Sequence, residues 1–99
     1  MPDREHTIRG IRFTWDPVKA RTNWRKHGIR FETACTAFFD PLLRVVDAGT
    51  EGAEVREAIF GMTEEWELLV VVFVERGEVF RIISARHATR QERRAYEDQ

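Results

Sequence analysis

The most strongly apolar part of the chain is an unbroken run over residues 68–74, in which four of the seven side chains are valine. Because the run is short, bounded by polar residues and rich in β-branched side chains, it predicts a strand covered on both faces. Gly77 follows in a polar segment and can supply the positive φ that a tight hairpin turn needs. The predicted return strand, residues 79–86, carries Arg81 inside it and Arg86 at its end. Arginine is rare inside a sheet without a partner, so both side chains need an explanation.

The segment before these strands predicts one strand and two helices. Residues 11–15 alternate between apolar and polar side chains, which is typical of a half-buried strand. Asp16 and Pro17 are residues that favour the start of a helix, and Gly28 favours its end. A second short helix is expected over residues 31–38, because its apolar side chains recur at helical spacing.

The first of these helices carries a polar stripe beside an apolar one. At about 100° per residue, three polar side chains share one stripe. They are Lys19, Asn23 and Lys26. The pattern predicts that Ala20 and Trp24, on the adjoining stripe, are buried, with His27 between the two stripes. A helix of this kind is expected to lie along the rim of a site.

The remaining elements complete an α+β domain over residues 11–99. Strands are predicted over residues 42–47 and 54–62, and a last helix opens with a capping box at Thr89 and runs through Tyr96. Residues 1–10 are expected to be a frayed leader. The predicted order is β-α-α-β-β-β-β-α, with a mostly antiparallel sheet built from hairpins and packed by helices.

Length and composition favour a small cytoplasmic protein. The 99 residues suffice for one domain with a modest core, and 42% hydrophobic and 33% charged residues are ordinary for a globular protein. A single cysteine, Cys35, excludes an internal disulfide and favours a reducing compartment. No apolar stretch reaches the ~18 residues of a membrane span, and the first residues lack the apolar core of a signal peptide.

The formal net charge of −1 conceals a strong segregation of charge. Fourteen of the 16 basic residues are arginine, whose planar guanidinium suits phosphate and carboxylate. Residues 4–30 hold eight basic and two acidic side chains, whereas residues 47–67 hold seven acids and one arginine. Residues 81–94 hold five arginines and one glutamate. This separation is compatible with a phosphate-bearing ligand at the basic end and equally with a charged protein partner.

Candidate catalytic and binding residues are concentrated in two segments of the chain, and neither segment resembles a metal or cofactor site. No paired-cysteine or His-x-x-x-His spacing is present, and no glycine-rich phosphate loop. The first helix offers Lys19, Asn23, Lys26 and His27. RNA cleavage needs a group that takes a proton from the 2′-hydroxyl, cations near the phosphorane, and a proton for the leaving oxygen. The alternative interpretation of this group is a solvated helix face with a histidine near the helix C-terminus.

The second place is the end of the chain. Arg81 and Arg86 should project from opposite faces of a regular strand unless a bulge intervenes, so they are not assumed to share a pocket. Each could bind an anion or form a structural ion pair. Glu92 and Tyr96 are one helical turn apart, with Arg93 beside them. Tyr96 could equally close over the sheet as a hydrophobic side chain.

Several sequence blocks, in order, resemble the BrnT family, the toxin half of a bacterial type II toxin–antitoxin pair. The blocks are residues 13–20, Asn23, 26–32 (KHGIRFE), 37–41, 54–56, 59–61, 68–71, 81–86 (RIISAR), 88–89, 92–93 and 96–97. The two blocks written out in letters are specific only in combination, and the likeness extends over residues 11–97.

This resemblance implies a RelE-like fold and a metal-independent endoribonuclease that cleaves RNA, inhibits translation and needs no cofactor. It also implies a BrnA-like ribbon-helix-helix antitoxin as partner, through which operator DNA is contacted. The candidate catalytic residues are Lys26, His27, Arg81, Arg86, Glu92 and Tyr96. The candidate RNA-binding residues are Lys19, Asn23 and Arg93. The alternative is a non-catalytic protein-binding module that acts with a DNA-binding partner.

Overall fold

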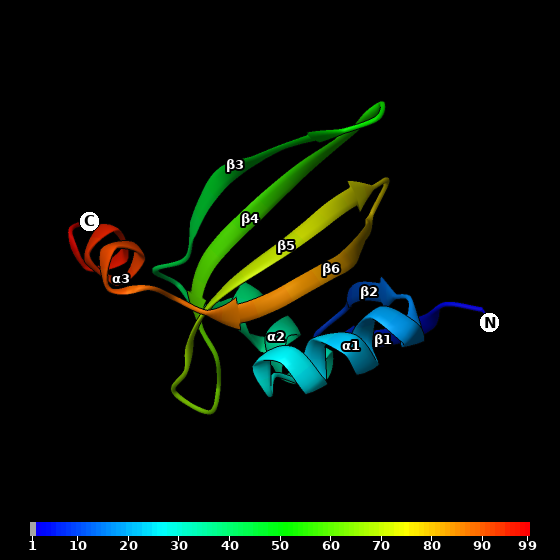
Figure 1. Ribbon diagram of the computed structural model, residues 1–99, viewed down its shortest axis with the longest axis horizontal. Coiled ribbons are helices and arrows are strands. Elements are labelled where there is room, and N and C mark those ends of the chain that lie inside the picture. The colour runs from blue at the N-terminus through cyan, green and yellow to red at the C-terminus, as the bar shows by residue number, and fades with distance from the viewer. Residues whose placement is uncertain (1) are drawn as a thin grey trace.

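The computed structural model describes residues 2–99 and contains a six-stranded sheet in the order β1-β2-β6-β5-β4-β3 (Figure 1). The strands are β1 (Arg4–Ile8), β2 (Ile11–Trp15), β3 (Arg44–Glu51), β4 (Glu54–Met62), β5 (Leu68–Arg76) and β6 (Val79–His87). The helices are α1 (Pro17–His27), α2 (Phe31–Thr36), the 3₁₀ turn η1 (Ala37–Phe39) and α3 (Arg90–Glu97). Neighbouring strands pair antiparallel except β2 and β6, which pair parallel. The predicted α+β class with a mostly antiparallel sheet is confirmed.

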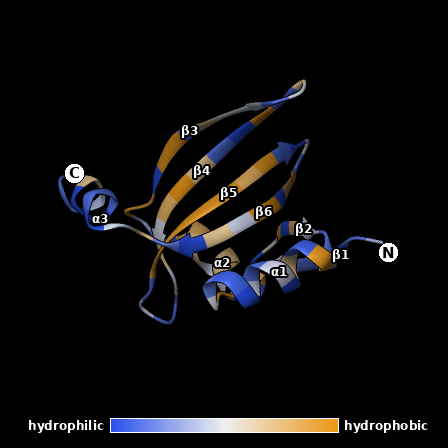
Figure 2. Cartoon of the chain, viewed as in Figure 1, coloured by the Kyte–Doolittle hydropathy of each residue, from blue (hydrophilic) through white to orange (hydrophobic). Residues whose placement is uncertain are grey.

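The central hairpin of β5 and β6 forms as the hydrophobic pattern predicted. Arg76 pairs with Val79 across a two-residue turn, and Gly77 has a φ of 61° there. Residues 68–71, 73 and 74 of β5 are buried, so both faces of this strand are covered. Figure 2 shows β5 as a mainly hydrophobic band through the middle of the sheet.

One face of the sheet, which we call the helix face, packs against α1, α2 and η1. Its core is aromatic at the centre: Phe13 is fully buried and its ring lies 5.1 Å from that of Phe38 and 5.9 Å from that of Phe80. Phe31 and Cys35 of α2 are also buried, as the spacing of that helix predicted. Burial raises the pKa of the Cys35 thiol to about 12, so it behaves as a small apolar side chain.

The N-terminal segment differs from the prediction of a frayed leader. Arg4–Ile8 forms β1, which pairs antiparallel with β2 from Arg4 opposite Trp15 to Ile8 opposite Ile11. Arg9 and Gly10, both at positive φ, make the turn between the strands. The segment is ordered because its backbone completes the edge of the sheet, although most of its side chains are polar and exposed.

Helix α1 has the predicted ends but not the predicted faces. Asp16 caps it by accepting a hydrogen bond from the Val18 amide, and Gly28 ends it at a φ of 69°. Asn23, expected on an exposed stripe, is only 6% exposed, whereas Trp24, expected to be buried, is 47% exposed. The reason is that α1 lies along the part of β6 that β2 does not reach, and Asn23 satisfies the backbone there.

The C-terminal half follows the prediction closely, with one shifted strand. Residues 54–62 form β4 at the predicted bounds, whereas β3 spans Arg44–Glu51 instead of residues 42–47. The predicted capping box opens α3: Thr89 accepts from the Glu92 amide, and the Glu92 carboxylate accepts from the Thr89 amide. In the described chain, no helix is long and apolar enough to cross a membrane.

Candidate active site

A β-bulge places Arg81 and Arg86 on the same face of the sheet. On β5, Val70 pairs with Arg86 and Val74 pairs with Arg81, and the register shifts between Val72 and Phe73. Because Val70 and Val74 are four residues apart on a regular strand, they project from one face, and their partners do so too. The extra residue on β6 is Ile83. The two arginines are thus separated by about 13 Å along the face opposite the helices.

Two further arginines, absent from the sequence-based site, join this face. Arg44 pairs with Phe60, which pairs with Val70, which pairs with Arg86, so one row across four strands has an arginine at each end. Arg56 precedes Glu57 on β4 and shares a face with Ala58 and Phe60. We call the surface that carries Arg44, Arg56, Arg81 and Arg86 the arginine face.

The signal for these two residues was partly present in the sequence. Alternation along residues 54–62 already placed Arg56 beside Ala58 and Phe60 on one side of the strand. The sequence did not reveal that this side faces away from α1 and α2. Arg56 pairs with Glu51 at 2.9 Å, and its buried Nε has no hydrogen-bond partner among the described residues.

Arg86 of β6 and Glu92 of α3 form a bidentate ion pair. The Arg86 Nη1 lies 2.7 Å from Glu92 Oε1, and Nη2 lies 2.9 Å from Oε2. The Arg86 guanidinium lowers the pKa of Glu92 to about 2, against the opposing effect of burial and with help from the Thr89 amide. Glu92 is therefore ionised at neutral pH and holds the guanidinium in a fixed orientation.

Tyr96 is held by Asp40, one residue after η1. The Tyr96 hydroxyl donates to Asp40 Oδ2, which also accepts from the Met62 amide, while Oδ1 accepts from the Leu42 amide. Burial and the negatively charged acceptor raise the pKa of Tyr96 to about 12, so the hydroxyl is neutral and donates. Burial acts to raise the pKa of Asp40, but its three hydrogen bonds outweigh that effect and lower it.

Arg81 is engaged by the N-terminal segment rather than by the C-terminal helix. Its Nε and Nη2 donate to the two carboxylate oxygens of Asp3 at 3.0 and 3.1 Å. Its side chain is 20% exposed and lies toward the turn end of β6, away from α3. The structure therefore separates Arg81 from the group formed by Arg86, Glu92 and Tyr96, although all four border one face.

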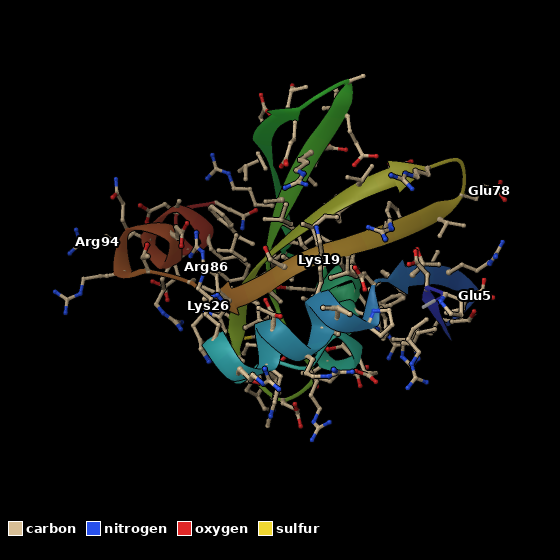
Figure 3. All side chains as sticks on the ribbon, turned by 45° about the vertical axis from the view of Figure 1, so that its right-hand side comes forward. Glu5, Lys19, Lys26, Glu78, Arg86 and Arg94 are labelled. Atoms are coloured by element: carbon tan, nitrogen blue, oxygen red, sulfur yellow. The ribbon has the colours of Figure 1, made fainter. Side chains whose placement is uncertain are left out.

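Helix α1 contributes lysines to the edge of this face. The Asn23 side chain donates to Ala85 O at 2.9 Å and accepts from Ala85 N at 3.0 Å, which fixes α1 beside β6. Lys26 follows Asn23 by one turn, and Figure 3 shows it at the same end of β6 as Arg86, with Lys19 farther along the strand. Both lysines are exposed, and neither forms an ion pair with another described residue.

The other predicted residues have different positions. His27 is half-buried at the end of α1, and Arg93 is exposed on α3. Asn23, predicted as an RNA-binding residue, is buried, and its amide bonds the backbone of Ala85 and Ile29. Within residues 2–99, no three His, Cys, Asp or Glu side chains are grouped so that they could hold a metal ion.

Chemically, the cations at this end of the arginine face can bind a phosphodiester. Guanidinium and ammonium groups neutralise phosphate oxygens, and a guanidinium with a fixed orientation does so with little loss of side-chain freedom. An imidazole can give or take a proton near neutral pH. A neutral tyrosine offers a hydroxyl donor and a ring that can stack on a base.

Comparison with known proteins gives a consistent result. The protein-family model that describes the BrnT ribonuclease toxins of type II toxin–antitoxin systems matches residues 15–92 of this chain. The chain is similar to the crystal structure of the Brucella abortus ribonuclease toxin BrnT, with a TM-score of 0.59 and 25% identity over 77% of this chain and 94% of that chain. No curated protein sequence matches. With the family model covering most of its length, the chain belongs to the BrnT ribonuclease toxins of type II toxin–antitoxin systems, which implies an antitoxin partner.

Proposed function

We propose that the protein is a metal-independent endoribonuclease that cleaves RNA and so inhibits translation. The observation that carries this proposal is the grouping of Arg86, Glu92, Tyr96 and Lys26 at one end of the arginine face. Family membership supports ribonuclease activity in general, and the grouping supports a specific place for it. Arg44, Arg56 and Arg81 place further guanidinium groups over the rest of the face, where the RNA backbone would continue in competition with the Glu51 and Asp3 partners of Arg56 and Arg81.

Each group has a role that follows from its surroundings. Arg86 and Lys26 neutralise the scissile phosphate as negative charge builds up on its oxygens. His27 exchanges protons with the 2′-hydroxyl or the leaving 5′-oxygen. Glu92 is a poor proton carrier at neutral pH, since its pKa is about 2, so it acts by positioning Arg86. Tyr96 orients a nucleotide with its ring or its hydroxyl.

The test is RNA cleavage by the purified chain, free of antitoxin, in excess EDTA. We expect cleavage of single-stranded RNA to persist in EDTA and to fall by roughly 10²–10³-fold in Arg86→Ala, because a positioned cation is lost. Lys26→Ala should also reduce it, whereas Arg25→Ala, which removes an exposed cation from the neighbouring position, should not.

Two results would contradict different parts of this proposal. Activity that disappears in EDTA and returns with Mg²⁺ would rule out the metal-independent mechanism. Full activity in both Arg86→Ala and His27→Ala would rule out the site while leaving the family's ribonuclease function intact. Expression of the chain alone should arrest growth, whereas a non-catalytic binding module would not.

We further propose that the antitoxin is a BrnA-like ribbon-helix-helix protein that also carries the operator contacts. The formal net charge of −1 supports DNA binding by the antitoxin rather than by this chain, because sequence-independent DNA affinity comes mainly from excess positive charge. In a gel-shift experiment, the complex should retard operator DNA and the toxin alone should not. Retardation by the toxin alone at physiological salt would contradict the proposal.

A further inference from the structure

A cleft of about 390 Å³ opens on the helix face, away from the arginine face. Its lining is mainly apolar and aromatic, and includes Phe39, Leu43, Val45, Phe73 and Phe80. The cleft exists because α1 and α2 pack against the β1, β2 and β6 side of the sheet, while β3 and β4 extend away from them (Figure 1). None of these residues belongs to the site described above.

The apolar surface continues beyond the cleft over two strands. Val45 of β3 is 53% exposed and pairs with Ile59, which lines the cleft. Val55 of β4 is 63% exposed and lies on the same side of its strand as Ile59. Exposed apolar surface that is continuous over several residues marks a contact with another molecule. Because this apolar surface extends over β3 and β4, it suits a segment of another protein better than a small ligand.

The charged residues that line the cleft are acidic, and the one cation recorded against a lining residue in the described chain, Arg9 at 4.9 Å from the Phe39 ring, is paired with Glu64. Glu57 and Glu75 line the cleft, and Asp47 pairs with Glu57 on the neighbouring strand and faces the same way. No basic side chain is among the described lining residues. A phosphate-bearing ligand would be repelled here, whereas lysine or arginine side chains beside an apolar anchor would be attracted.

We propose that this surface, the acidic cleft, anchors the antitoxin through an amphipathic segment whose apolar side chains are flanked by lysine or arginine. The proposal rests on the antitoxin partner of the proposed function, and it places the anchor on the opposite face of the sheet from the RNA site. Apolar side chains of the segment fill the space between Phe39, Val45 and Phe80. Its basic side chains pair with Glu57 and Glu75.

The experiment measures binding of the adjacent reading frame's product, purified separately, to variants of the full chain by calorimetry. Val45→Glu should weaken binding by roughly tenfold or more, because a carboxylate enters the apolar contact. Val18→Glu is the matched control, since Val18 is also 53% exposed but lies on α1. Glu75→Lys should weaken binding and reduce its dependence on salt, whereas Glu65→Lys, on an exposed loop, should do neither.

RNA cleavage by the free variants separates this inference from the proposed function. Val45→Glu and Glu75→Lys should cleave RNA like the unmodified chain, because the acidic cleft and the arginine face lie on opposite sides of the sheet. Unchanged antitoxin binding in both variants, or equal weakening by Val18→Glu, would overturn the proposed anchor. If Val45→Glu is misfolded by circular dichroism, Glu75→Lys decides alone. Lack of cleavage by the unmodified chain would contradict the nuclease proposal but not the anchor.

Discussion

The helix-face core and helix α3 are held in place by different kinds of interaction. In the core, Phe13, Ile82 and Ala85 are fully buried among aromatic and aliphatic neighbours. Among the described residues of α3 none is buried, and Figure 2 shows this helix as mostly hydrophilic. Polar contacts attach it: the Arg86–Glu92 pair, the Tyr96–Asp40 hydrogen bond, and a hydrogen bond from Arg44 to Ala95 O at 2.8 Å.

Global stability and the candidate site are therefore supported by separate parts of the molecule. Burying one large apolar side chain contributes about 1.5–3 kcal/mol, whereas a partly exposed ion pair contributes about 0.2–1 kcal/mol. The core therefore sets the free energy of unfolding. Helix α3, with its catalytic candidates, can detach locally at much lower cost, as segments at binding sites often do.

The largest expected effect comes from removing a ring at the centre of the core. Phe13→Ala should reduce the free energy of unfolding by about 3–5 kcal/mol, because Phe13 is fully buried against Phe38 and Phe80. Urea denaturation followed by tryptophan fluorescence measures it, with Phe13→Leu as the milder control. A loss below about 1 kcal/mol would mean that apolar packing does not dominate the core.

A smaller effect is expected from Asn23, a polar residue on which the core nevertheless depends. Asn23→Ala leaves the N–H and C=O of Ala85 without their side-chain partner, and should cost about 2 kcal/mol of unfolding free energy. Thr22→Ala, at the exposed neighbouring position of α1, should change it by less than about 0.5 kcal/mol. Equal stability of the two variants would show that water replaces the amide at this edge.

Asn23 also shows which parts of the fold the sequence could predict. The β5–β6 hairpin, the caps of α1 and the capping box of α3 were predictable, because each depends on residues close together in the chain. The burial of Asn23 was not, since it depends on the β2 side of β6 being unpaired at Ala85, 62 residues away. β1 was missed for a related reason: its side chains give little pattern, and its order comes from backbone pairing with β2.

Some residues of the candidate site could be proposed from the sequence, but their arrangement could not. The resemblance of residues 81–86, 92–93 and 96–97 to a known family made Arg86, Glu92 and Tyr96 candidates. Whether Arg81 shares a face with Arg86 depended on the bulge at Ile83, which leaves no mark in the sequence pattern. Arg44 and Arg56 were missed because their importance depends on which face of the sheet points away from α1 and α2.

The smallest effect on stability, and the most local one, is expected at Tyr96, the only tyrosine in the chain. Its pKa is raised from 10.0 to about 12, so the contact with Asp40 stabilises α3 fully below pH 10 and is lost as pH rises toward 12. Asp40→Asn removes the charge and should move the tyrosinate absorbance titration toward pH 10, while the free energy of unfolding at pH 7 changes by less than about 1 kcal/mol. Asp47→Asn, on β3, is the control and should leave the titration unchanged.

A Tyr96 titration that does not move in Asp40→Asn would mean that α3 is not held by this hydrogen bond. A large loss of global stability instead would mean that α3 belongs to the same cooperative unit as the core.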